Sequence, residues 1–216
     1  MGRNVFITGG TGYMGGALIR KLAKRGHQIR ALVRPGSERK LPNGCSAVVG
    51  DALKAESYAA QVPPADTFVQ LVGTPSPNPR KAHLFREVDL ASGVAGVAAA
   101  KTAGVEHFVY VSVAQPAPIM KDYVQARAEC EKAIRASGLN ATILRPWYVL
   151  GPGHRWPYLL LPLYGLASLF PGARQSARRM GLVTLRQMIT ALVWAVENPC
   201  LGVRLFDVGA IRQVRP

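Results

Sequence analysis

The sequence predicts an α/β protein with a doubly wound parallel sheet. Short apolar runs alternate with helical patterns over the first two-thirds of the chain, and such alternation requires a parallel sheet that is covered on both faces. The first apolar run, residues 4–8, leads into a glycine-rich turn from which an amphipathic helix begins. Hydrophobic residues make up 49% of the 216 residues and charged residues 18%, which suits one domain with a sizeable core.

Seven strands are expected along the chain, with helices between most of them. The strands are predicted at 4–8, 28–34, 47–50, 66–73, 107–113, 140–145 and 203–208. After the helix that follows the glycine turn, further helices are predicted from about His83 to Ala103, from about Asp122 to Ser137, and from Leu185 to Val196 with Thr184 as its N-cap. Gly104 and Gly138 end two of them.

The glycine turn carries the most specific signal in the sequence. Gly9, Gly12 and Gly15 form a GxxGxxG pattern between a strand and a helix, which is a relative of the dinucleotide-binding fingerprint. In that motif the glycines allow a tight turn, a close approach of the backbone to a pyrophosphate, and close packing of helix on strand. The alternative is a structural turn without a ligand. The motif predicts a Rossmann fold with residues 1–150 as its dinucleotide-binding core.

The end of the second strand bears on the choice of cofactor. Arg34 stands there and no acidic residue competes with it. An arginine at this place accommodates the 2′-phosphate of NADP, whereas a carboxylate would bind the 2′-hydroxyl of NAD. We therefore expect NADP, with NAD as the less favoured cofactor, and the alternative interpretation of Arg34 is a solvated charge.

The segment 151–216 is predicted to complete the same domain with a lid segment, a helix and a final strand. Residues 156–171 are nearly free of charge and contain three prolines, and Arg174, Arg178 and Arg179 follow. A lid over an apolar substrate is the leading interpretation. A peripheral membrane contact through 156–179 is the alternative.

Charge and cysteine content limit the partners. The net charge of +15 allows nucleic acid, an anionic membrane or an anionic small ligand. The basic residues are scattered and there is no nucleic-acid motif, so a basic solvated surface is favoured and no nucleic-acid partner is expected. The three cysteines are widely spaced without a metal-ligand pattern, which favours a reduced, cytoplasmic protein.

Several segments together resemble the short-chain dehydrogenase/reductase superfamily, in particular its atypical NAD(P)H-binding, NmrA-like and epimerase-like branch. They are TGGTGYMGG, VVGD, YVSVA and LRPWYVLGPG, in this order along nearly the whole chain. The resemblance implies that the pyrophosphate of the cofactor is held by Gly9, Thr11, Gly12, Tyr13, Met14 and Gly15. It also implies that Arg34 binds the 2′-phosphate, that Asp51 binds the adenine, and that the nicotinamide end lies near Gly73, Pro146 and Tyr148.

The resemblance also implies a catalytic helix. Active members place a tyrosine four residues before a lysine, and here the pair is Tyr123 and Arg127. Tyr123 would be the acid/base, Arg127 its electrostatic partner, and Ser112 a possible orienter of the substrate. The alternative for Tyr123 and Arg127 is an ordinary helix face.

The expected function is reduction of a small, apolar carbonyl or quinone-like substrate with NADP(H). A non-catalytic redox sensor or assembly subunit that binds NADP(H) is the alternative. Only 71 residues follow the sixth strand, which disfavours a sugar-nucleotide epimerase, because those members of the superfamily usually carry a larger C-terminal substrate domain.

Overall fold

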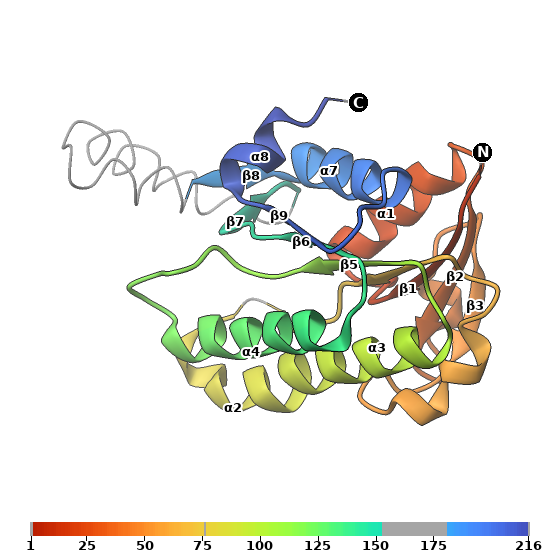
Figure 1. Ribbon diagram of the computed structural model, residues 1–216, viewed down its shortest axis with the longest axis horizontal. Coiled ribbons are helices and arrows are strands. Elements are labelled where there is room, and N and C mark those ends of the chain that lie inside the picture. The colour runs from red at the N-terminus through yellow and green to blue at the C-terminus, as the bar shows by residue number, and fades with distance from the viewer. Residues whose placement is uncertain (1, 76, 153–180, 216) are drawn as a thin grey trace.

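The computed structural model describes residues 2–75, 77–152 and 181–215, and it confirms the doubly wound sheet (Figure 1). Seven strands pair in the order β3-β2-β1-β4-β5-β6-β9, and every pair is parallel. The strands are β1 (Asn4–Thr8), β2 (Gln28–Val33), β3 (Ser46–Val49), β4 (Thr67–Gln70), β5 (His107–Val111), β6 (Ala141–Leu144) and β9 (Val203–Phe206). The order reverses between β1 and β4, and ligands in such sheets bind at the carboxyl edge of this switch point.

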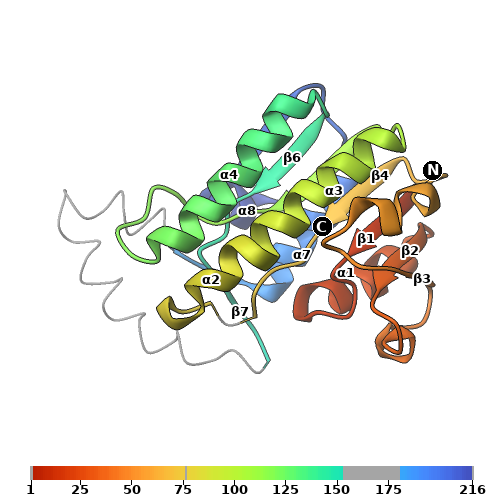
Figure 2. The same cartoon turned by 90° about the horizontal axis from the view of Figure 1, so that it is seen from below.

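Helices cover both faces of the sheet. One layer holds α1 (Tyr13–Ala23), α7 (Leu185–Glu197) and α8 (Val208–Gln213) (Figure 1). The other layer holds α2 (Ala82–Leu84), the π-helical segment η5 (Phe85–Leu90), α3 (Ala91–Thr102) and α4 (Lys121–Ser137), which cross the opposite face (Figure 2). Within the described residues, four 3₁₀ turns lie in the connections: η1 (Glu38–Lys40), η2 (Ala55–Ser57), η3 (Ala59–Gln61) and η4 (Pro79–Lys81).

Each face of the sheet has its own hydrophobic core. Under α1 and α7, fully buried side chains such as Leu18 and Leu192 pack against Ile7 of β1. Under α3 and α4, the rings of Phe6, Phe68 and Phe108 on adjacent strands form a ladder with successive centroids 5.3 Å apart. Burial on both faces explains why these strands are almost continuously apolar in the sequence.

Helix ends follow the sequence signals closely. The side chain of Thr184 accepts a hydrogen bond from the backbone N–H of Gln187, and the Gln187 side chain accepts one from the Thr184 N–H, so α7 begins with a capping box. Gly104 and Gly138 end their helices with φ of +65° and +77°, a conformation that favours glycine. The predicted start of α7 and the predicted ends of α3 and α4 are therefore confirmed.

Several features differ from the prediction, among them the fourth and fifth strands, which end at Gln70 and Val111 instead of 73 and 113. The last strand ends at Phe206 instead of 208, because the Asp207 side chain accepts a hydrogen bond from the Ala210 N–H at 2.8 Å and caps α8. The helix predicted over 83–103 contains a π-helical segment, η5. A second, two-stranded parallel sheet joins β7 (Tyr148–Leu150) and β8 (Leu182–Thr184).

The segment predicted as a lid or membrane contact, 156–179, lies outside the described residues. Among the helices that the structure describes, none has both the length and the apolar character needed to span a bilayer.

Candidate active site

The glycine turn packs directly against the first turn of α1. The Gly12 N–H donates to the Gly9 carbonyl at 3.0 Å, and Gly9 has φ of +76°. A Cβ atom at Gly15 would collide with this same Gly9 carbonyl oxygen. Glycine is therefore required at position 15 by close packing, as the fingerprint predicts for the third glycine.

The N-terminus of α1 is open to an anion. Gly12 is the N-cap, no side chain caps the helix, and no acidic residue lies in its first turn. The first N–H groups of a helix lack intrahelical partners and carry a partial positive charge, so they favour an anionic ligand. Thr11 and Tyr13 are exposed here and Met14 is half-buried. The geometry thus fits a pyrophosphate.

Arg34 lies immediately after β2 at the same edge of the sheet, and its side chain is exposed. Arg39 and Lys40, in η1, are exposed as well. The carboxylate of Glu38 in this loop accepts a hydrogen bond from the Gly36 N–H at 3.3 Å. The loop therefore presents three cations, while its carboxylate bonds to its own backbone.

The other predicted cofactor residues also lie at or near the carboxyl edge. Asp51 follows β3, and its carboxylate accepts a hydrogen bond from the Leu53 N–H at 3.0 Å. Gly73 follows β4. The Pro146 carbonyl accepts a hydrogen bond from the Ala114 N–H at 2.9 Å, which joins the segments after β5 and β6, and Tyr148 begins β7.

Tyr123 lies in the first turn of α4 between an aromatic ring and a cation. Its ring centroid is 5.0 Å from that of Phe85, and the guanidinium carbon of Arg127 lies 5.3 Å from it. Burial raises the pKa of the Tyr123 phenol, and the charge of Arg127 opposes this effect only in part. The phenol therefore keeps its proton at neutral pH.

The guanidinium of Arg127 is directed into the protein. Its Nη2 donates to Asp89 Oδ1 at 2.6 Å, and its Nη1 donates to the Val111 carbonyl at 2.9 Å and to the Tyr110 hydroxyl at 3.3 Å. Only 6% of Arg127 is exposed, and its Nε has no hydrogen-bond partner among the described residues. The guanidinium also fills the space in which a side chain at Gly73 would lie.

Asp89 is the counter-charge of Arg127, and the sequence analysis missed it. It is fully buried in η5, and its Oδ2 accepts hydrogen bonds from the N–H and the hydroxyl of Thr74 at 3.0 and 2.5 Å. Asp89 thus ties η5 and α4 to the loop after β4. The signal in the sequence was an acidic residue within a helix of mostly small and apolar residues.

A second buried carboxylate, Glu131, organises the end of β5. It accepts hydrogen bonds from the Ser112 hydroxyl at 2.6 Å and the Gln115 amide at 2.7 Å, and both Nε and Nη2 of Arg145 donate to it at 2.9 and 2.5 Å. The hydroxyl proton of Ser112 is therefore directed at Glu131. The i, i+4, i+8 spacing of Tyr123, Arg127 and Glu131 on one helix could have revealed this residue.

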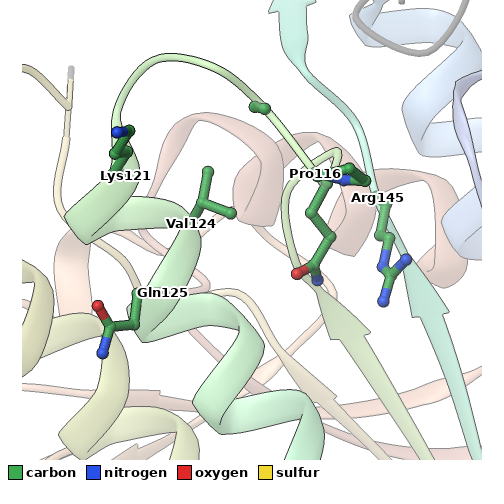
Figure 3. A pocket seen from close by; sticks show the side chains of 7 residues that line it. Pro116, Lys121, Val124, Gln125 and Arg145 are labelled. Carbon is green, nitrogen blue, oxygen red and sulfur yellow. The ribbon is translucent and has the colours of Figure 1, made fainter.

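A pocket of about 440 Å³ opens beside this cluster. Lys121, Val124 and Gln125 form its wall on α4, and Pro116 and Arg145 form the facing wall (Figure 3). Gln115 and Ala117 also line it. The walls are part apolar and part cationic or amide, and the pocket reaches the first turn of α4 at Lys121, two residues before Tyr123, which does not itself line it.

The parallel sheet with its switch point, the tight glycine turn and the open helix N-terminus define a Rossmann-type nucleotide-binding protein. The chain belongs to the NAD(P)H-binding family, whose model matches residues 9–155. The family resemblance that the sequence indicated is confirmed.

Among curated proteins, the chain is similar to a ceramide reductase from Caulobacter vibrioides, with 28% identity over 94% of this chain and 64% of the reductase. It thus spans less than two-thirds of that relative's length. A UDP-glucose 4-epimerase from Vibrio cholerae is 23% identical over 100% of this chain and 75% of the epimerase. Among solved structures, the Bordetella bronchiseptica enzyme WbmH in complex with NAD+ has a TM-score of 0.70 at 20% identity, covering 95% of this chain and 75% of that one. The similarity to WbmH shows the fold alone.

Proposed function

We propose that this protein is an NADP(H)-dependent reductase of a small, largely apolar carbonyl or quinone-like compound. Membership of the NAD(P)H-binding family supports the cofactor class, and the similarity to a ceramide reductase over 94% of the chain supports reduction of an apolar substrate. The observation that carries the proposal is the open N-terminus of α1 behind the glycine turn, with the basic loop of Arg34 at the same edge of the sheet.

In this proposal the cofactor is held by backbone groups of the glycine turn and by the cations after β2. Gly9, Gly12 and Gly15, with Thr11, Tyr13 and Met14, surround the pyrophosphate, and Arg34 takes the 2′-phosphate. Asp51 lies at the adenine, and Gly73, Pro146 and Tyr148 lie toward the nicotinamide. When bound, the reduced nicotinamide supplies a hydride.

The substrate would use the pocket beside α4. The apolar part of the substrate packs on Pro116, Ala117 and Val124, and the carbonyl oxygen of the substrate faces the start of α4. Tyr123 would donate the proton to that oxygen, and the bound nicotinamide would supply the hydride. Because burial raises the pKa of this phenol, it suits proton donation in the reducing direction better than proton removal in the oxidising direction.

Arg127 acts as the electrostatic partner of Tyr123 in this proposal. Its cation–π contact with the Tyr123 ring supports that role, and its inward hydrogen bonds leave the binding of the nicotinamide ribose to other groups. Ser112 orients the substrate indirectly. Its hydroxyl helps to fix Glu131, and Glu131 in turn holds Gln115 and Arg145 at the pocket.

The second candidate function is a non-catalytic NADP(H)-binding sensor or assembly subunit. It is favoured by the engagement of Arg127 with Asp89 and of Ser112 with Glu131, which leaves the two predicted helpers of Tyr123 bonded within the protein.

Single-turnover oxidation of NADPH with a panel of apolar aldehydes, ketones and quinones separates the two functions. The Tyr123→Phe variant is expected to bind NADPH unchanged and to lose about 10²-fold or more of the hydride-transfer rate. Wild-type protein that binds NADPH and oxidises it with none of the panel supports the sensor, and equal rates for wild type and Tyr123→Phe overturn the role of the phenol.

A further inference from the structure

A second pocket, of about 540 Å³, lies between α1 and α7. We call it the α1–α7 groove. Its two helices, α1 and α7, lie on the layer opposite to α3 and α4 (Figure 1), and none of the residues that line the α4 pocket lines the groove. The groove is therefore separate from the proposed substrate site.

Four cations line the groove. Arg20 and Lys21 lie in the last turn of α1, Lys24 is its C-cap, and Arg186 lies in the first turn of α7. All four side chains are exposed, and within the described part of the chain none of them forms an ion pair. The described lining contains no acidic residue. This density of uncompensated positive charge calls for an anionic partner.

The remaining lining distinguishes between anionic partners. Leu185 is half-buried among the cations, the buried side chains of Leu150 and Ile189 form the floor, and no aromatic residue is present in the described lining. Surfaces that bind single-stranded nucleic acid combine cations with aromatic rings on which bases stack. Exposed cations without aromatic rings instead match the phosphates in the headgroup region of an anionic bilayer.

We propose that the α1–α7 groove docks the protein on membranes that contain anionic phospholipids. This inference goes beyond the proposed reductase function and does not depend on it. It assigns part of the net charge of +15 to one site, whereas the sequence alone favoured a generally basic surface. Each lysine or arginine brought to an anionic surface strengthens binding about fivefold, so several together give measurable attachment.

The test is co-sedimentation with vesicles of phosphatidylcholine alone and of equal parts phosphatidylcholine and phosphatidylglycerol. The groove variant is Arg20→Gln/Lys21→Gln/Lys24→Gln. The charge-matched control is Lys101→Gln/Lys132→Gln/Arg135→Gln, which removes three exposed cations from α3 and α4 on the opposite layer. NADPH affinity and thermal unfolding of all three proteins are measured in parallel to confirm that each is folded.

Wild-type protein is expected to sediment with the phosphatidylglycerol vesicles and not with phosphatidylcholine alone. The groove variant is expected to bind at least tenfold more weakly, and the control variant to stay within about twofold of wild type. The proposal is overturned if vesicle binding falls equally in both variants, if neither variant weakens it, or if the wild-type protein does not bind the vesicles. Duplex DNA binding that depends on the same three cations, without vesicle binding, overturns it in favour of a nucleic-acid surface.

Discussion

Breaking the buried Asp89–Arg127 pair should destabilise the protein strongly. Asp89 is fully buried and Arg127 is 6% exposed, and their side chains meet at 2.6 Å. In the Asp89→Asn variant the guanidinium would remain buried without a counter-charge. Removing one partner of a buried ion pair costs about 3–5 kcal/mol, a large part of the 5–15 kcal/mol that stabilises a typical domain.

A double-mutant cycle measures the coupling in this pair. Asp89→Asn, Arg127→Met and the double variant are unfolded in urea, and free energies of unfolding are taken from the linear dependence on denaturant. Both single variants should lose about 3 kcal/mol or more, and the double variant should lose less than their sum by at least about 2 kcal/mol, since it leaves no unpaired charge. A loss below about 1 kcal/mol for Asp89→Asn, or additivity within about 0.5 kcal/mol, would refute the inward placement of Arg127.

Three further predictions concern other parts of the fold. Burial, with Arg3 and Arg204 nearby, lowers the pKa of His107 to about 4. The unfolded state therefore binds more protons than the folded state, and the free energy of unfolding should fall by about 3 kcal/mol as the pH drops from 6.5 toward 4. The urea midpoint should depend less steeply on pH for His107→Gln than for wild type, and identical slopes would contradict this. Gly15→Ala should weaken NADPH binding at least tenfold by displacing the turn, whereas Gly16→Ala should bind within about twofold of wild type, because a Cβ there would make only ordinary van der Waals contacts, the nearest at 3.6 Å. Equal calorimetric affinities of the two variants would argue against the packing at position 15. Thr184→Ala should cost about 1 kcal/mol by removing the N-cap of α7, and an unchanged urea midpoint would show that the cap is dispensable.

The local signals in the sequence were sufficient for most of the sheet and for several helix ends. The glycine turn, the Thr184 cap and the glycine at 138 act through neighbouring backbone atoms, so their effect can be worked out from a short window of sequence. The last strand was predicted too long because β-branched Val208 was assigned to it, whereas the Asp207 side chain begins a helix there.

Features that depend on distant residues were not predictable in the same way. Pairing of β7 with β8 joins segments more than 30 residues apart, and neither strand is longer than three residues. The site was predicted by residue type at Tyr123 and Arg127, but the counter-charge of Arg127 lies 38 residues away in the chain. Only the fold shows that Asp89 draws this guanidinium inward and that Glu131 engages the hydroxyl of Ser112.

Calorimetric titration with NADPH and with NADH, for wild type and Arg34→Glu, tests the central claim most directly. The account predicts that wild-type protein binds NADPH at least tenfold more tightly than NADH, a difference of about 1.4 kcal/mol, and that Arg34→Glu loses this preference while it still binds NADH. Wild-type protein that binds neither nucleotide would contradict the cofactor site at the glycine turn, and with it the proposed reductase.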